Sequence, residues 1–318
     1  MLIKKYSIVN YLNEKRLHFV FLVLVIFSFS TILTSCVSGK KTDNFRNYYV
    51  NSDSIIKEGY ELYYLEKASW TSTDFIKKKY GPFSEINNYL GYMSYKDQDT
   101  IFSIYYKMID SNIKVFETYK FNNTSILESM MVVSETRDMN NIEKYMLKCL
   151  NQIEKLQDTI PFYFTPPNAG KNLVFLREGN QFRLFILTGT FEHDVIPFGN
   201  DFVFKFDSEG ESMIGGQIHP TVVFDKDSSK VPEKYGSYDP VKQTKNSNGV
   251  YEVCDHKHFG STPDFITSAD ICNILLYGKS KSYIVWSRKF ISIFTPNDKE
   301  PLSIFTRKFV EQQVKRKR

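Results

Sequence analysis

Apolar and polar positions along this chain follow two patterns, one typical of α-helices and one typical of β-strands. Apolar residues recur at three- and four-residue spacing over 52–67 and 139–156, which predicts two amphipathic helices. Between them, runs rich in β-branched and aromatic residues at 89–95, 100–108 and 113–121 are separated by short polar segments. The first half of the chain is therefore expected to form a helix and an antiparallel meander, followed by a second helix.

The second half of the chain contains more predicted strands than helices. Helices are expected from 268 to 278 and over 302–314, and the Lys-, Asp- and Ser-rich stretch 224–248 is expected to be exposed. The expected fold class is α+β, with a small N-terminal helix plus antiparallel meander in 51–128 and a mixed sheet with flanking helices in 129–318. Short apolar runs predict the strands of this second part at 172–176, 182–187, 202–206, 213–218, 250–254, 283–287 and 290–294.

The longest apolar run lies near the beginning, from Phe19 to Leu33, and contains no charged residue. Four basic residues and one acidic residue precede it. Because a bilayer-spanning helix needs about 20 apolar residues, this shorter run behind a basic segment predicts an export signal over residues 1–35. An ordinary secretory signal that ends near a cysteine by chance is one interpretation of the junction.

The junction itself, Leu33-Thr34-Ser35-Cys36, resembles the lipobox of bacterial lipoproteins. By that resemblance, the signal is removed and Cys36 carries a diacylglyceryl group that anchors the protein to a membrane. The expected location is the cell envelope, on its periplasmic or surface face. Residues 36–50 are polar and small, and they are expected to form a tether between the lipid and the first domain.

Charge and cysteine content narrow the possible partners. The chain carries +5, and three of these charges belong to residues 1–35, so about +2 remains, which is no electrostatic footprint for nucleic acid. The basic cluster 315–318 predicts a solvated segment or, alternatively, a contact with anionic lipid headgroups. Three cysteines follow Cys36, namely Cys149, Cys254 and Cys272, and an odd number does not form a disulfide framework, although one pair stays possible.

One constellation of residues carries recognisable chemistry. His256 and His258 alternate on a predicted strand, which places both imidazoles on one face about 6–7 Å apart. Asp270 lies in the first turn of the next predicted helix and can return to that face. Two imidazoles and one carboxylate leave one tetrahedral position open for water, as expected of a catalytic zinc site. Cys254 shares the strand face and is either a further ligand or a buried core residue.

The same residues resemble the signature of the JAMM (JAB1/MPN) metalloprotease fold, which is His-x-His, a spacer, and then Ser-x-x-Asp. Here the pattern is His256-Lys257-His258 followed by Thr267-Ser268-Ala269-Asp270. The resemblance implies that 129–318 form a JAMM-like domain and that His256, His258 and Asp270 bind zinc. It also implies that Thr267 replaces the serine that steadies the oxyanion. The implied activity is hydrolysis of peptide or isopeptide bonds.

Two departures from the JAMM pattern bear on activity. Threonine replaces serine at Thr267, and the glutamate that acts as general base in the family has no clear counterpart. The corresponding stretch 160–164 contains no acid, while Glu178 and Glu192 lie at predicted turns. Loss of a general base removes about 10²- to 10⁴-fold of rate. A non-catalytic envelope or surface binding protein that keeps the fold is therefore the alternative function.

The helix start offers a simpler interpretation as well. Thr267-x-x-Asp270 before an apolar run is the sequence of a capping box, in which the two side chains satisfy backbone N–H groups at the start of a helix. The cluster Glu192-His193-Asp194 is expected to be a polar turn, and no phosphate-binding glycine loop is present.

Overall fold

The structure is a computed structural model that describes residues 43–122, 130–157, 168–179, 181–219, 222–225, 239–258 and 265–316. The predicted signal segment, Cys36 and the stretch 160–164 lie outside these residues. None of the described helices combines the length and the hydrophobicity that crossing a bilayer requires.

The first described helix, α2 (Asp43–Tyr80), is much longer than the predicted helix over 52–67. No glycine or proline interrupts the sequence between Gly59 and Gly81, so the helix continues through its polar second half. Gly81 ends it with a φ of 81°, a conformation that glycine adopts without a steric penalty. A short 3₁₀ turn, η1 (Phe83–Glu85), leads into the first strand.

The predicted meander is confirmed, and it belongs to a ten-stranded sheet. The strand order is β11-β10-β9-β7-β6-β1-β2-β3-β4, with β5 also paired to β3. Neighbouring strands are antiparallel except β1 and β6, which run parallel and pair through Tyr95 and Phe175. The strands are β1 (Tyr89–Asp97), β2 (Thr100–Ile109), β3 (Asn112–Asn122), β4 (Met131–Val133), β5 (Arg137–Asp138), β6 (Ala169–Glu178), β7 (Gln181–Thr190), β9 (Asp201–Phe206), β10 (Met213–His219) and β11 (Val222–Asp225).

Two smaller sheets complete the described strands. The two-stranded sheet pairs β8 (Val195–Phe198) with β12 (Asp239–Lys242). The four-stranded sheet has the order β13-β14-β15-β16, in which β13 and β14 are parallel and the other pairs are antiparallel. Its strands are β13 (Cys254–Lys257), β14 (Tyr283–Trp286), β15 (Phe290–Phe294) and β16 (Leu302–Thr306).

Three sequence predictions in this second half are wrong in detail. The strand expected at 250–254 begins only at Cys254, because Val250 is exposed and the preceding residues form a turn. The expected exposed stretch 224–248 contains the end of β11 and all of β12, while 226–238 lie outside the described residues. The helix expected over 302–314 begins as β16, since its first five residues pair with β15, and α5 (Arg307–Arg316) follows.

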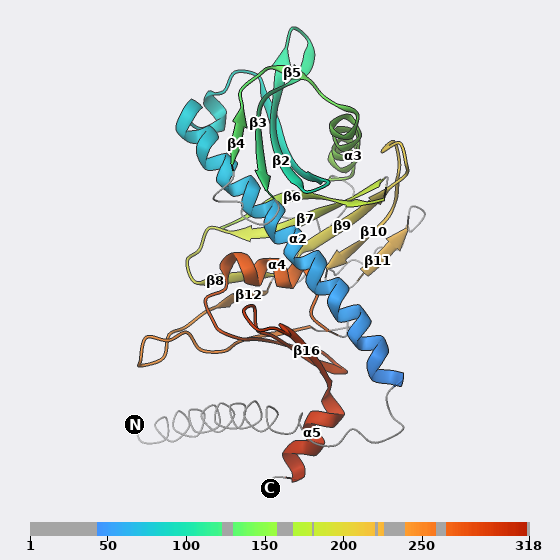
Figure 1. The fold of residues 1–318 in the computed structure, drawn as a ribbon, viewed down its shortest axis with the longest axis vertical. Coiled ribbons are helices and arrows are strands. Elements are labelled where there is room, and N and C mark those ends of the chain that lie inside the picture. The colour runs from blue at the N-terminus through green and yellow to red at the C-terminus, as the bar shows by residue number, and fades with distance from the viewer. Residues whose placement is uncertain are drawn as a thin grey trace. The chain divides into compact units, whose positions relative to one another are not determined.

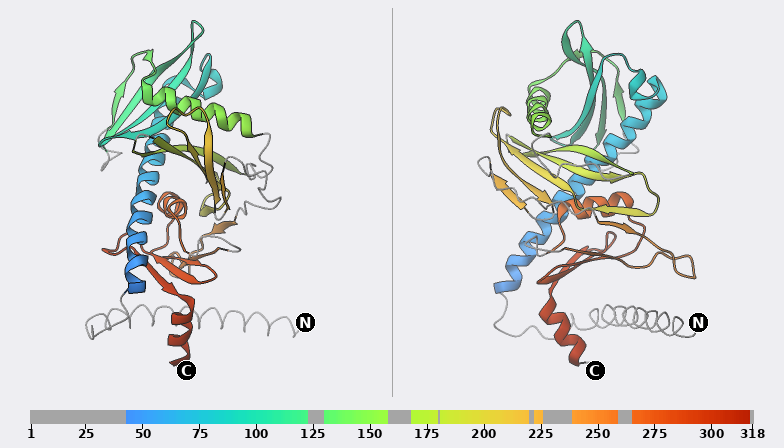
Figure 2. Two further views of the ribbon diagram at one scale, coloured as in Figure 1. Left: turned by 90° about the vertical axis from the view of Figure 1, so that its right-hand side faces the viewer. Right: turned by 180° about the vertical axis from the view of Figure 1, so that it is seen from behind.

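The remaining helices pack against the sheets from different sides (Figures 1 and 2). The amphipathic helix α3 (Asn141–Gln157), close to its predicted bounds, shares a core cluster with strands of the meander and with β6, β7 and β9. The short helix α4 (Ser268–Tyr277) lies between the large sheet and the four-stranded sheet, and its residues belong to the core on both sides. Helices and mixed sheets together confirm the α+β class.

The predicted boundary between residues 128 and 129 falls in the stretch 123–129, outside the described residues. Residues from both sides of it contribute to two of the three core clusters. The division into an N-terminal and a C-terminal domain stays a prediction about how the two parts fold.

Helix α4 is held against α2 by a close backbone approach. A Cβ atom added at Gly59 would lie 2.6 Å from Cγ2 of Ile271, so only glycine allows this contact without a shift. One residue earlier, Glu58 accepts a hydrogen bond of 2.6 Å from the Ser268 hydroxyl and forms an ion pair with Arg183 of β7. The first turn of α4 therefore has a fixed position relative to α2 and the large sheet.

Candidate metal centre

The two histidines lie on one face at the end of β13. Burial alternates along the strand, with Cys254 and His256 buried and Asp255 and Lys257 exposed. His258 follows the strand directly, and its backbone N–H donates a 2.7 Å hydrogen bond to the Trp286 carbonyl of β14. The imidazole centroids are 5.0 Å apart with the rings nearly perpendicular. The same-face arrangement predicted from strand alternation is thus confirmed.

The acid of the predicted site lies in the first turn of α4. Thr267 caps the helix, and its hydroxyl accepts a 3.2 Å hydrogen bond from the Asp270 backbone N–H. In return, Oδ2 of Asp270 accepts hydrogen bonds of 2.8 Å from both the backbone N–H and the hydroxyl of Thr267. The capping-box interpretation is therefore correct for the helix start. It does not compete with the site interpretation, because Oδ2 also lies 3.2 Å from Nε2 of His258.

The end of β13 and the start of α4 bring three possible ligand atoms close together. One ligand atom from each of His256, His258 and Asp270 lies within 4.8 Å of the other two. The histidine residues are 6 % exposed and Asp270 is 1 % exposed. These residues form a buried group that could bind a metal ion, and they are the residues that the sequence pattern indicated.

The end of β8 closes one side of this group, a feature that the sequence analysis missed. The Phe198 ring stacks on the His256 imidazole with a centroid distance of 4.2 Å and an interplanar angle of 12°. The Asn273 side chain of α4 donates a 2.7 Å hydrogen bond to the Pro197 carbonyl. These contacts fix the His256 ring and join β8 to α4.

A second buried carboxyl group, that of Asp201, is influenced electrostatically by Asp270. Asp201 is 1 % exposed, and its Oδ1 accepts a 2.6 Å hydrogen bond from the Thr188 backbone N–H. Its Oδ2 has no hydrogen-bond partner among the described residues. Burial raises the pKa of Asp201, and the charge on Asp270 raises it further, while the charge on Lys171 opposes both. An acid whose protonation responds to Asp270 therefore lies within electrostatic reach of the centre.

Lys171 of β6 completes this polar group in the large sheet. Its ammonium donates a 2.8 Å hydrogen bond to the Thr188 hydroxyl and another to the Asn200 carbonyl. Burial lowers the pKa of Lys171. Sequence reasoning missed both charged residues because they lie far from the His-x-His pattern. The available signal was a single acid at the start of a strongly apolar strand, Asp201-Phe202-Val203-Phe204.

The cysteines do not extend the ligand group. Cys149, Cys254 and Cys272 are all buried and free, which answers the open question of a disulfide pair. Cys254 belongs to the apolar cluster around α4 and the four-stranded sheet. Burial raises the pKa of the Cys254 thiol to about 12. Among the described residues, the group whose ligand atoms lie close enough to share an ion consists of His256, His258 and Asp270 and does not include Cys254.

The other polar candidates lie elsewhere. Glu192 is exposed and accepts a 3.2 Å hydrogen bond from the Asn168 side chain. Asp194 accepts a 2.9 Å hydrogen bond from the Tyr251 hydroxyl and pairs with Lys279, so the cluster around exposed His193 is a polar turn as predicted. Glu178, the other acid considered as a base, lies at the end of β6.

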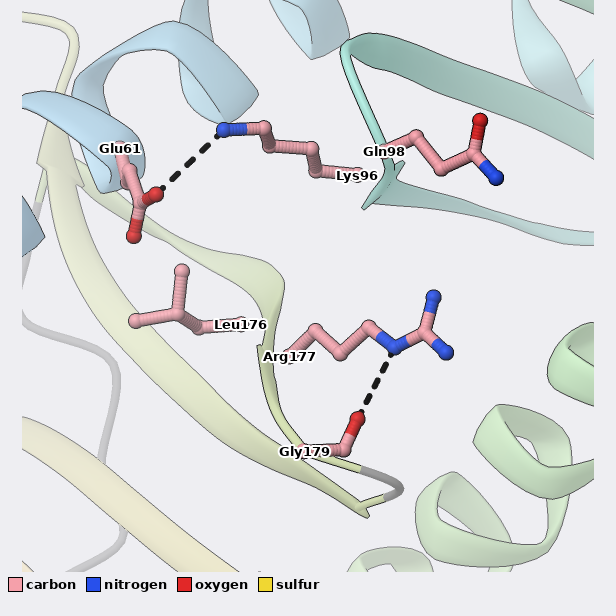
Figure 3. A pocket seen from close by; sticks show the side chains of 6 residues that line it. All are labelled: Glu61, Lys96, Gln98, Leu176, Arg177 and Gly179. Carbon is pink, nitrogen blue, oxygen red and sulfur yellow. Dashed lines mark hydrogen bonds and ion pairs between the residues drawn. The ribbon is translucent and has the colours of Figure 1, made fainter.

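A small surface pocket of about 270 Å³ is lined by residues other than the candidate metal ligands (Figure 3). Its lining residues are Glu61, Lys96, Gln98, Leu176, Arg177 and Gly179. The two cations are already engaged, because Lys96 lies 3.4 Å from the Glu61 carboxylate and Arg177 donates a 3.0 Å hydrogen bond to the Gly179 carbonyl. The pocket contains none of the residues of the metal centre.

Comparison with models of known protein families finds no match to this chain, and comparisons with curated proteins and with solved structures find none either.

Proposed function

We propose that this chain is a lipoprotein, anchored to a membrane through Cys36, that binds zinc at His256, His258 and Asp270 and hydrolyses peptide or isopeptide bonds. The observation that carries the proposal is the approach of three ligand atoms, from two segments, to within 4.8 Å of one another. The anchor rests on the lipobox resemblance, and the substrate class rests on the JAMM resemblance.

The donor set fits zinc better than the common alternatives. Two imidazoles and one carboxylate are typical of zinc enzymes, whereas magnesium and calcium prefer oxygen ligands. Three protein ligands leave the fourth tetrahedral position for a water molecule, as in catalytic rather than structural zinc sites. Zinc bound in such a set lowers the pKa of its water toward neutrality.

The chain's own residues hold this geometry. Thr267 fixes the Asp270 carboxylate through two hydrogen bonds, and Phe198 fixes the plane of the His256 ring. Since the Thr267 hydroxyl is engaged with Asp270, its role here is to position a ligand, and stabilisation of an oxyanion stays a prediction. The loss of a contact that orients a metal ligand typically weakens metal binding about 10- to 100-fold.

We propose Asp201 as the proton acceptor that the sequence did not provide, because the charge of Asp270 acts on this buried carboxyl group. Its raised pKa moves its protonation change toward neutral pH, where a general base is most effective. Lys171 and the Thr188 N–H favour the carboxylate form, and Asp270 disfavours it. An acid poised between these influences can take a proton and release it again.

Metal analysis of the purified full chain tests the zinc assignment. After dialysis against zinc and then against zinc-free buffer, we expect one equivalent of zinc per chain by plasma mass spectrometry. His258→Gln is expected to lose it, while His193→Ala, a change at an exposed histidine, is expected to keep it. Circular dichroism confirms that the variants fold. Zinc below one-tenth of an equivalent in the unaltered chain would end the proposal.

A non-catalytic metal-binding protein is the second candidate, and the burial of the ligands favours it. The side chains of His258 and Asp270 are each 1 % exposed, and Asp270 already serves the helix cap. A fluorogenic peptide library separates the two functions. Hydrolysis that falls at least about 100-fold in Asp201→Asn with zinc retained supports the enzyme. Zinc binding without hydrolysis supports the second candidate.

A further inference from the structure

One end of the four-stranded sheet carries a concentration of exposed cations, which we call the basic edge: Lys257, Arg288, Lys289, Arg307 and Lys308. The strand register explains why they gather. Lys257 pairs with Trp286, Arg288 and Lys289 form the following turn, and Phe290 after that turn pairs with Thr306. The Arg307 backbone N–H then donates a 2.8 Å hydrogen bond to the Lys289 carbonyl. All five residues therefore lie at the same end of the sheet.

Acidic residues are few in the described strands of this sheet and in α5. In 254–258, 283–294 and 302–316, the four strands of the sheet with their shared turn and α5, the acids are Asp255 and Glu311 against seven basic residues. This edge is far more basic than the chain as a whole, whose net charge is only +5 over 318 residues. Such a patch attracts an anionic surface.

Helix α5 adds an apolar flank to the basic edge. Along α5 the basic residues Arg307, Lys308 and Lys315 are exposed, while Phe309 and Val310 on the other side are half-buried. Phe309 stacks on Phe305 of β16 with a centroid distance of 6.4 Å. Helix α5 continues from β16 and projects away from the four-stranded sheet (Figures 1 and 2). A short helix with one basic and one apolar side is suited to the boundary between lipid headgroups and water.

The first half of α2 packs against the core beside this same sheet. Ile55 and Ile56 contact the core cluster that also receives Ile304 of β16. Cys36 precedes Ile55 by only 19 positions in the sequence, so the proposed lipid anchor is close along the chain to a segment that contacts this part of the fold.

We propose that the basic edge, with the apolar flank of α5, docks on anionic lipid headgroups, so that the anchored protein rests on the membrane in one orientation. This inference rests on the anchoring part of the proposed function. Firm membrane attachment usually requires two membrane-binding features, such as a lipid chain and a basic patch. Each basic residue near an anionic surface strengthens binding about fivefold. Docking also orients the exposed Lys257, and with it the neighbouring histidines of the metal centre, relative to the membrane.

The test uses the full lipidated chain in vesicles of phosphatidylcholine alone or with 30 % phosphatidylglycerol. A Gln312→Cys variant carries an NBD fluorophore, which labels this position because the native Cys149, Cys254 and Cys272 are buried. Quenching of NBD by spin-labelled lipid reports contact between α5 and the bilayer. We expect at least twofold stronger quenching in the anionic vesicles, and its loss in 0.5 M salt.

Charge variants and a control position complete the test. Replacement of Arg288, Lys289 and Lys308 by glutamine is expected to weaken docking about 100-fold, whereas Lys77→Gln with Lys78→Gln in α2 leaves it unchanged. A probe at Ser111→Cys, in the exposed β2–β3 turn, is expected to show no lipid quenching in either vesicle. Equal quenching at Gln312→Cys in both vesicles, or quenching that ignores the triple variant, would overturn the docking proposal.

Vesicle flotation keeps the two proposals apart. A chain that floats with neutral vesicles is anchored, whatever the probe reports. A chain that floats only with anionic vesicles lacks the anchor and supports docking by the basic edge alone. Flotation with neither vesicle contradicts both proposals.

Discussion

Helices α3 and α4 begin with the same local motif but place it in different surroundings. In α3, Asn140 and Glu143 form a capping box with two reciprocal hydrogen bonds of 2.9 Å. In α4, Thr267 and Asp270 form the equivalent box. Both acids are buried, with Glu143 0 % and Asp270 1 % exposed. The difference lies in what faces each carboxylate.

Glu143 faces a fixed positive charge. Arg137 donates two hydrogen bonds of 2.7 Å to its two oxygens, and the Tyr95 hydroxyl donates a third of 3.0 Å. Asp270 instead faces His258, with His256 beside it. A bidentate arginine neutralises an acid permanently, whereas imidazoles are neutral ligands when a cation is bound. The comparison shows that a capping box explains why an acid is present, and its neighbours decide whether the acid can also hold a metal.

The largest expected effect comes from a substitution of Asp270, the buried acid of α4. If zinc binds as proposed, free zinc at about 1,000 times the dissociation constant is expected to stabilise the native chain by about 4 kcal/mol. Asp270→Asn is expected to abolish this increment while it keeps an oxygen for the cap. Urea unfolding with zinc or with chelator measures it, and the exposed Asp255→Asn is the matched control. An increment that persists in Asp270→Asn would show that zinc binds elsewhere.

The second-largest expected effect comes from a substitution of Arg137, the residue that faces the buried acid of α3. Arg137→Ala leaves Glu143 buried without its arginine and is expected to lower the free energy of unfolding by about 3 kcal/mol, since a third of the Arg137 side chain is exposed and water can partly replace it. The loss is expected to be the same with zinc and with chelator. Urea unfolding checks this, and a loss below about 1 kcal/mol would mean that Arg137 is not needed to compensate Glu143.

A third buried acid, Glu66 on α2, extends the comparison, because burial is the main influence on the pKa of its carboxyl group. Burial raises its pKa to about 8, and the neighbouring Trp70 side chain only partly offsets this. The folded chain therefore holds this proton more tightly than the unfolded chain. This contribution to stability is fully present below about pH 4.5 and is lost as the pH rises to about 8.

Glu66→Gln tests that relation. The free energy of unfolding of the unaltered chain is expected to fall by about 2 to 3 kcal/mol more than that of Glu66→Gln between pH 5 and pH 7. Urea unfolding at both pH values measures the difference. Parallel pH profiles for the two proteins would show that Glu66 is ionised in the folded chain.

The smallest effects compare the two caps directly. Asn140→Ala and Thr267→Ala are each expected to cost about 1 kcal/mol of stability, measured with chelator present. Only Thr267→Ala is expected to weaken zinc binding, by about tenfold, because it removes a hydrogen bond that orients Asp270. Zinc titration against a chromophoric chelator distinguishes them. Equal zinc affinity in both variants would mean that the cap does not position the ligand.

The local sequence was sufficient to select the three candidate ligands. His256 and His258 are two residues apart on a strand and Asp270 belongs to a helix cap, so periodicity and capping rules place each on its element, whereas their approach to one another is a tertiary contact. The strands of the meander were predictable for the same reason, since polar turns separate them. β16 was mistaken for a helix because its pairing with β15 is a tertiary contact that a short apolar run does not reveal.

The surroundings of the ligands could not be predicted because they are distant in sequence. Phe198 reaches His256 from the end of β8, which a hydrogen bond from Asn273 to the Pro197 carbonyl joins to α4. Lys171 lies opposite Thr188 through the pairing of β6 with β7. No local pattern marks these residues or Asp201, so only the fold reveals them.

X-ray absorption at the zinc edge of the zinc-loaded full chain tests the central claim most directly. The geometry predicts two imidazole ligands at about 2.0 Å and one or two further oxygen ligands at similar distance, with no sulfur at about 2.3 Å. The imidazole signal is expected to halve in His256→Gln. A sulfur shell, or a spectrum with no imidazole contribution, would contradict the account.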